Sequence, residues 1–131
     1  MLKIYYFHPM ELYFSDIEKE DLVFLSRKGI VTNPRDIDLQ NMIDYIKLLK
    51  EHDVVYYRDL YYSVAFEVLS ALAFGIPVYL LETKRRVSKR QLKEIVEVFE
   101  NSPYFKRNIK RFKTNFLEFY SKFLEVIKIS G

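Results

Sequence analysis

The carboxylate of Glu67 is the side chain whose sequence surroundings most favour chemistry. It lies in the run Ser63–Ala73, where nearly every other residue is small or apolar. Burying a carboxylate in such a run without a partner is costly. Glu67 therefore either faces a ligand crevice or pairs with a cation such as Arg58, or it is a solvated residue stabilised by the dipole of its helix. Spacing alone leaves these alternatives open.

The elements that position Glu67 follow from alternating strand and helix patterns. Short aromatic and β-branched runs predict strands over residues 3–7, 30–32, 53–57 and 77–81, with 109–112 as a candidate fifth. Helical spacing predicts helices over 15–27, 38–51, 63–74 and 88–100, followed by a last helix over 114–127 or one long helix over 105–127. This alternation predicts an α/β domain spanning residues 1–131: a doubly wound parallel sheet of four or five strands with helices on both faces.

Local signals mark where these helices begin and end. Ser15 with Glu18, and Ser88 with Gln91, have the spacing of helix N-terminal caps. Gly75 is a stop signal, as is Gly29. In the first helix Leu12, Ile17, Leu22, Val23 and Leu25 fall at mixed helical spacing.

Candidate site residues cluster where the predicted strands end. In doubly wound sheets, ligands bind beyond the carboxyl ends of the strands, where the strand order reverses. His8 and Pro9 follow the first strand, and Arg58 and Asp59 follow the third. His8 is a candidate acid or phosphate contact, the alternative being a polar residue that ends the strand. Asp59 and Glu67 are expected to flank the crevice.

A phosphate would find a natural contact at Ser63. This residue opens the predicted helix that carries Glu67, and the free N–H groups and dipole of a helix N-terminus favour an anion. Arg58 or Arg35 would add positive charge.

The charge is divided unevenly along the chain. Residues 1–82 carry 8 Lys/Arg and 13 Asp/Glu, a net charge of −5, whereas residues 83–131 carry 13 and 5, a net charge of +8. Solvated helix faces account for the basic part, and because no recognition motif accompanies it, nucleic acid is not expected as a partner. The aromatic content, with eleven Tyr and eleven Phe, favours self-association into a homodimer or larger homo-oligomer.

The chain contains no cysteine and two histidines, which excludes thiol chemistry and disfavours a metal site, and no cofactor is expected. No apolar run is long enough for a membrane span, and the N-terminus lacks the layout of a signal peptide, so a cytoplasmic location is expected.

Residues 1–82 resemble the nucleoside 2-deoxyribosyltransferase family and the related 2′-deoxynucleoside 5′-phosphate N-hydrolases. An aspartate, Asp53, opens a hydrophobic strand, and a helix with an aromatic-Glu pair follows it. The most specific part is the run of Phe66, Glu67, Ala71, Gly75, Pro77 and Val78, with intervals Phe-Glu-x-x-x-Ala-x-x-x-Gly-x-Pro-Val.

The resemblance implies a flavodoxin-like fold and a glutamate nucleophile that falls on Glu67. The glutamate attacks the anomeric carbon of a deoxyribosyl group, a second acid protonates the leaving base, and water or another base then accepts the sugar. Tyr5 or Tyr6 would position the nucleophile or sugar. Asp59 and Asp44 lie near positions at which the family has acidic or hydroxyl residues.

Departures from the family pattern support an alternative in the binding class. Ser63 and Ala65 replace two glycines, and Tyr61 and Tyr45 occupy the positions of a Ser or Asp and of an Asp. The first hypothesis is an N-glycosidic enzyme acting on a (deoxy)nucleoside or nucleotide. The second is a nucleotide-binding module of the same fold with weak or no catalysis.

Overall fold

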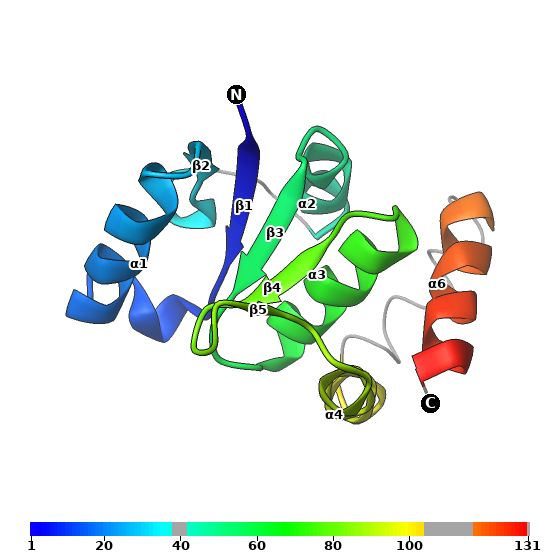
Figure 1. Cartoon of the computed structure of the whole chain (residues 1–131). Helices are drawn as coiled ribbons and strands as arrows, with labels where there is room; N and C mark the ends of the chain where they lie inside the picture. Colours follow the sequence, from blue (N-terminus) through cyan, green and yellow to red (C-terminus); the bar gives the residue numbers. More distant parts are fainter. Residues whose placement is uncertain (38–41, 104–116, 131) are drawn as a thin grey trace.

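A five-stranded, mostly parallel sheet packed with helices forms the α/β structure of this chain (Figure 1). The computed structural model describes residues 1–37, 42–103 and 117–130. The order across the sheet is β2-β1-β3-β4-β5, and β5 alone runs antiparallel to its neighbour. The strands are β1 (Lys3–Phe7), β2 (Ile30–Thr32), β3 (Val54–Tyr57), β4 (Val78–Leu80) and β5 (Arg85–Arg86).

The helices confirm the alternation predicted from the sequence. They are α1 (Asp16–Ser26), α2 (Met42–Leu49), α3 (Tyr62–Ala73), α4 (Lys89–Glu100) and α6 (Leu117–Ser130), with short 3-10 turns η1 (Met10–Leu12) and η2 (Pro34–Asp36). The last helix continues to Ser130, beyond the predicted end at 127. The candidate strand 109–112, the two alternative starts of the last helix and residues 38–41 lie outside the described residues.

The fifth strand occurs where the sequence predicts a loop, at residues 83–86. Lys84 adopts a left-handed backbone conformation with φ 58°. Its N–H donates to the carbonyl of Leu80 at 2.8 Å, and the N–H of Val87 donates to the carbonyl of Val78 at 3.1 Å. A tight turn of this kind is typical of Gly or Asn rather than Lys, which is why the sequence pattern does not indicate the hairpin.

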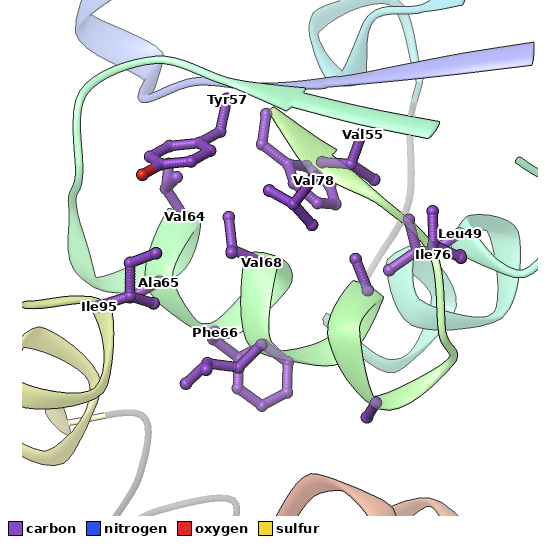
Figure 2. Packing of buried hydrophobic residues seen from close by; sticks show 14 of the residues in the cluster. Leu49, Val55, Tyr57, Val64, Ala65, Phe66, Val68, Ile76, Val78 and Ile95 are labelled. Atoms are coloured by element: carbon purple, nitrogen blue, oxygen red, sulfur yellow. The ribbon is translucent and has the colours of Figure 1, made fainter. Parts of the chain in front are cut away.

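The larger hydrophobic core lies between the sheet and α3. Val64 and Val68 are fully buried and point toward the sheet, where Val55 and Val78 lie, whereas Ala65 is buried beside Ile95 of α4 (Figure 2). Three phenylalanines then join α3 to the helices outside it, with ring centroids 5.1–5.8 Å apart: Phe66, Phe99 and Phe123. Because α3 packs against the sheet on one side and against helices on the other, its sequence is apolar around nearly its whole circumference.

A second hydrophobic cluster lies on the other face of the sheet. Among the described helices, α1 alone contributes residues to it. The buried face of α1 combines apolar and acidic residues. Ile17 and Val23 are 44% and 52% exposed, whereas Glu18 and Asp21 are 0% and 4% exposed. Leu25 is buried as well. Ionic partners from other loops, described below, make the burial of these two carboxylates tolerable.

Caps and turns match the local sequence signals. Ser15 caps α1 by accepting from the N–H of Glu18, and Ser88 and Gln91 form a reciprocal capping box on α4. Gly75 ends α3 with φ 74°. Gly29 has a different reason to be glycine: a Cβ there would lie 2.2 Å from the carbonyl oxygen of Leu2 as the chain enters β2 beside β1.

Candidate active site

The carboxyl ends of the four parallel strands bring the predicted site loops to one edge of the sheet. His8 and Pro9 follow β1, and Asn33 begins the turn after β2. Arg58 follows β3, and Glu82 lies just beyond β4. The reversal in strand order falls between β1 and β3, beside which α3 begins.

Glu67 lies in the second turn of α3 and acts electrostatically on two tyrosines. Burial is the largest cause that raises the pKa of Tyr5 on β1 and of Tyr13 between η1 and α1. The negative charge of Glu67 raises both pKa values further. Tyr45 of α2 acts on the same two phenols, and the pKa of Tyr13 reaches about 12. A carboxyl group and three phenols from α3, β1, the η1 loop and α2 thus form one group, which we call the tyrosine–glutamate cluster.

No cation or hydrogen-bond donor among the described residues pairs with the carboxyl group of Glu67. Solvent reaches part of the residue. The carboxyl group is nevertheless desolvated enough that burial raises its pKa to about 8. Glu67 is therefore largely protonated at neutral pH in the free protein.

The hydroxyl of Tyr5 is a buried polar group without a partner. The residue is 0% exposed, and its oxygen makes no hydrogen bond within the described part of the chain. Its ring is held from two sides, by Phe7 at 4.5 Å and by His52 at 4.8 Å between centroids. An unsatisfied hydroxyl costs about 1–3 kcal/mol, so the fold maintains it against its own stability.

A second carboxylate, Glu18, is buried and its charge is balanced by partners within the protein. His8 Nε2 lies 2.7 Å from Glu18 Oε2, the N–H of Phe14 donates to Oε1 at 3.0 Å, and Arg35 Nη1 also contacts Oε1. Burial acts to raise the pKa of Glu18, but the hydrogen bonds from His8 and Phe14 and the charge of Arg35 lower it overall. The ring of His8 also stacks on Tyr6 at 3.8 Å.

A third carboxylate, Asp21, is held by Arg58. Arg58 Nε and Nη2 donate to the two oxygens of Asp21 at 2.6 and 2.8 Å, and the hydroxyl of Tyr6 donates to Asp21 at 2.5 Å. Glu82 contacts the same guanidinium group at 3.6 Å. Arg58 therefore pairs with Asp21 and not with Glu67.

Most of the predicted binding residues are engaged within the protein. Tyr6 and His8 belong to the two ionic groups just described, and Pro9 is buried. Ser63 lies half-buried in the first turn of α3, after an N-cap residue, Tyr61, that makes no side-chain capping bond.

The two predicted acids lie on different elements, Asp59 in the loop after β3 and Asp44 on α2. Asp59 is exposed, with φ 55°, and its N–H donates to Glu82 at 3.2 Å. Asp44 is half-buried in the first turn of α2. The neighbouring residue, Tyr45, is the α2 side chain that acts on Tyr5.

Sequence reasoning did not identify five residues around this edge as site candidates, namely Tyr13, Glu18, Asp21, Tyr45 and Glu82. Only Glu18 and Asp21 carry a signal that could have revealed them. They are carboxylates spaced i, i+3 on the face of α1 that also carries Leu25.

The described residues contain no group of three or more His, Asp or Glu that could hold a metal ion. No helix among them has the length and apolar character needed to cross a membrane. His52 has a structural role: its Nε2 lies 2.6 Å from the Thr32 hydroxyl, its Nδ1 lies 3.0 Å from the Leu48 carbonyl, and burial lowers its pKa.

Comparison with known proteins yields no match to a protein-family model, a curated protein or a solved structure.

Proposed function

We propose that this chain cleaves or transfers the N-glycosidic bond of a (deoxy)nucleoside or nucleotide, with Glu67 as the nucleophile. The observation that carries the proposal is an unpaired, desolvated carboxyl group beside an unpartnered buried hydroxyl, that of Tyr5. Perturbed carboxyl groups of this kind are typical of functional sites. The strand order β2-β1-β3-β4 supports a flavodoxin-like arrangement, and in such sheets ligands bind where the strand order reverses.

The proposed reaction has two displacements at the anomeric carbon. An oxygen of ionised Glu67 bonds to that carbon while the carbon–nitrogen bond breaks, and the bond's electron pair leaves with the base, which is protonated by an acid. Asp59 and Asp44 are the proposed acids. Water or a second base then attacks the glycosyl ester and releases the Glu67 carboxylate.

The raised pKa of Glu67 is compatible with this role because the transition state is cationic. An oxocarbenium-like sugar beside the carboxyl group favours its charged form and lowers its pKa when substrate is bound. The hydroxyls of Tyr5 and Tyr13 can donate to the carboxylate or to a sugar hydroxyl once a ligand is present. The pKa of about 8 then predicts that kcat/KM of the free enzyme rises with pH until Glu67 is ionised.

A nucleotide substrate would place its phosphate at the N-terminus of α3. The N-terminus of α3 carries no side-chain cap, and Ser63 adds a hydroxyl in the first turn. Such a terminus suits a phosphate group. Arg58 is already bound to Asp21, so the phosphate would depend on the helix N-terminus more than on this guanidinium group.

A nucleotide-binding module without efficient catalysis is the second candidate. The observation that favours it is that Glu67 is mostly neutral at physiological pH, a state in which it donates a hydrogen bond rather than attacking. Ser63 and Ala65, at the positions of two glycines in the family that the sequence resembles, also favour the binding module. Their side chains limit the close approach of the backbone to a sugar.

Chromatography of free base released from a panel of nucleosides and their 5′-monophosphates separates the two candidates. Wild type, Glu67→Gln and the control Glu97→Gln, which changes an exposed carboxylate on α4, are compared with and without an acceptor base. We expect release by wild type and the control, and its loss in Glu67→Gln. Ligand-induced stabilisation without release from any substrate would favour the binding module.

Self-association is part of the same proposal. Met10 and Phe14 are 74% and 73% exposed near the site edge, and Tyr61 is 51% exposed at the start of α3. We propose a homodimer or larger homo-oligomer. Light scattering coupled to size-exclusion chromatography measures the assembly directly.

A further inference from the structure

A row of aromatic side chains crosses the sheet on the face that carries α1. Phe24 of α1 meets Tyr56 of β3 edge-on, with centroids 6.1 Å apart, and Tyr56 stacks on Tyr79 of β4 at 5.0 Å and 20°. Arg86 of β5 pairs directly with Tyr79 in the antiparallel register, so both side chains lie on the same face. We call Phe24, Tyr56, Tyr79 and Arg86 the aromatic row.

The outer half of this row is left partly open by the described helices. Tyr56 is 7% exposed, but Phe24 and Tyr79 are only half-buried and Arg86 is exposed. Among those helices, α1 alone contributes to the cluster beneath the row, whereas α2, α3, α4 and α6 pack in the cluster on the opposite face.

Positive charge surrounds the row. The ammonium groups of Lys28 and Lys84 lie 4.9 and 4.8 Å from the centroid of the Phe24 ring. Lys84 holds its position through a left-handed backbone conformation with φ 58°, which is unfavourable for a lysine. Two like charges are thus brought to one ring by α1 and by the β4–β5 turn.

The segment that contains β5 adds unpaired charge. Residues 83–93 carry six Lys/Arg and no Asp/Glu. None of these six, nor Lys28, forms an ion pair with a described carboxylate. Of these six, Lys84 and Arg86 lie at the aromatic row, whereas Lys89, Arg90 and Lys93 belong to α4, which packs on the opposite face of the sheet. The unpaired charge at the row costs stability in the free protein, so the surface is suited to an anionic partner.

A second copy of this chain is a poor occupant, because a symmetric contact would bring these like charges together. An acidic protein would pair with the positive charges but would offer no planar group to stack on the aromatic rings. A single nucleic-acid strand satisfies both, because each nucleotide presents a phosphate for Lys or Arg and a base that stacks on an aromatic ring. We propose that the aromatic row, together with Lys28 and Lys84, forms a binding surface for single-stranded nucleic acid.

This proposal rests on observations separate from those at Glu67. The sequence alone does not favour it, because the charges become informative only when β5 pairs with β4 and places Arg86 beside Tyr79.

Fluorescence anisotropy with labelled twelve-nucleotide oligothymidine and oligouridine tests the surface. The full chain is compared with Lys84→Ala, Arg86→Ala and the double variant. Lys50→Ala is the matched control, since Lys50 lies 4.9 Å from the centroid of Phe74 in the same kind of contact outside the proposed surface. If each cation meets one phosphate, each substitution lowers the slope of log affinity against log salt by about 0.7. We expect Lys50→Ala to bind as wild type does.

The contribution of stacking is measured with Tyr79→Leu, Tyr79→Phe and an abasic oligonucleotide of the same length. Tyr79→Leu should weaken binding at least about five-fold and Tyr79→Phe should preserve it, with circular dichroism checking the fold. The abasic strand should bind correspondingly more weakly. Equal binding of the abasic strand or of polyglutamate would overturn the proposal, as would no binding in 50 mM salt. Glu67→Gln should bind as wild type does, so this test does not depend on the proposed enzyme activity.

Discussion

The substitution Glu67→Gln tests whether this carboxyl group is desolvated and unpaired, without any assay of activity. The pKa of Glu67 is about 8 in the folded protein and 4.5 as the ordinary value. Between these values the folded state holds a proton that the unfolded chain has released, so the stability of the wild type falls as the pH rises. Integrated from pH 6 to pH 9, the loss is about 2–3 kcal/mol. Glutamine keeps the shape of the protonated acid and has no such dependence.

Urea unfolding of both proteins at several pH values between 6 and 9 measures the difference. We expect the variant to be more stable than the wild type by about 2 kcal/mol at pH 6 and by about 4–5 kcal/mol at pH 9, so that the difference grows by about 2–3 kcal/mol across the range. Other titrating groups cancel in this difference. The control Glu97→Gln should follow the wild type across the whole range. Parallel curves for wild type and Glu67→Gln would refute the inference that the fold desolvates this carboxyl group.

Three further substitutions test the surrounding groups. Tyr5→Phe removes the unpartnered hydroxyl and should raise the free energy of unfolding by about 1 kcal/mol while lowering base release; a loss of stability would mean that the hydroxyl has a partner. Asp21→Asn breaks the bidentate contact with Arg58 and should cost about 3 kcal/mol in urea unfolding at pH 7, and a cost under about 1 kcal/mol would contradict the pairing. Because the folded pKa of Glu18 is lowered, its contribution is full above pH 4.5 and is lost as the pH falls further. Glu18→Gln should therefore be less stable at neutral pH but less sensitive to acid, and acid titrations that coincide with wild type would argue against this group.

Most elements of the fold, β5 excepted, could be predicted because each carries its own local signal. The aromatic and β-branched strands, the capping box of Ser88 and the stop at Gly75 depend on residues close together in the chain. The first four strands and the helices between them follow from such signals.

The inner face of α1 could not be predicted in this way. The apolar residues Ile17 and Val23 are exposed, whereas Glu18 and Asp21 are buried beside Leu25. Their partners come from loops far away in sequence, with Arg35 following β2 and Arg58 following β3. A pattern of hydrophobicity in one helix contains no information about such partners.

In the candidate site, too, local signals can be predicted from the sequence and tertiary contacts cannot. Glu67 can be identified from sequence because a carboxylate is conspicuous among small and apolar residues. Its neighbours Tyr13 and Tyr45 cannot, because tyrosines are common in this chain and only the tertiary fold brings these two to Tyr5. The sequence leaves Arg58 open as a partner for Glu67, whereas in the structure Arg58 binds Asp21.

A covalent glycosyl ester on Glu67 is the central claim, and intact-protein mass spectrometry tests it most directly. The protein is mixed with a 2′-fluorinated analogue of whichever substrate releases base, since the fluorine slows breakdown of the ester, and is then quenched in acid. We predict a mass increase of one fluorinated glycosyl group, mapped by peptide sequencing to Glu67 and absent from Glu67→Gln. Base release without any adduct, or an adduct on another residue, would contradict the assignment of Glu67 as the nucleophile.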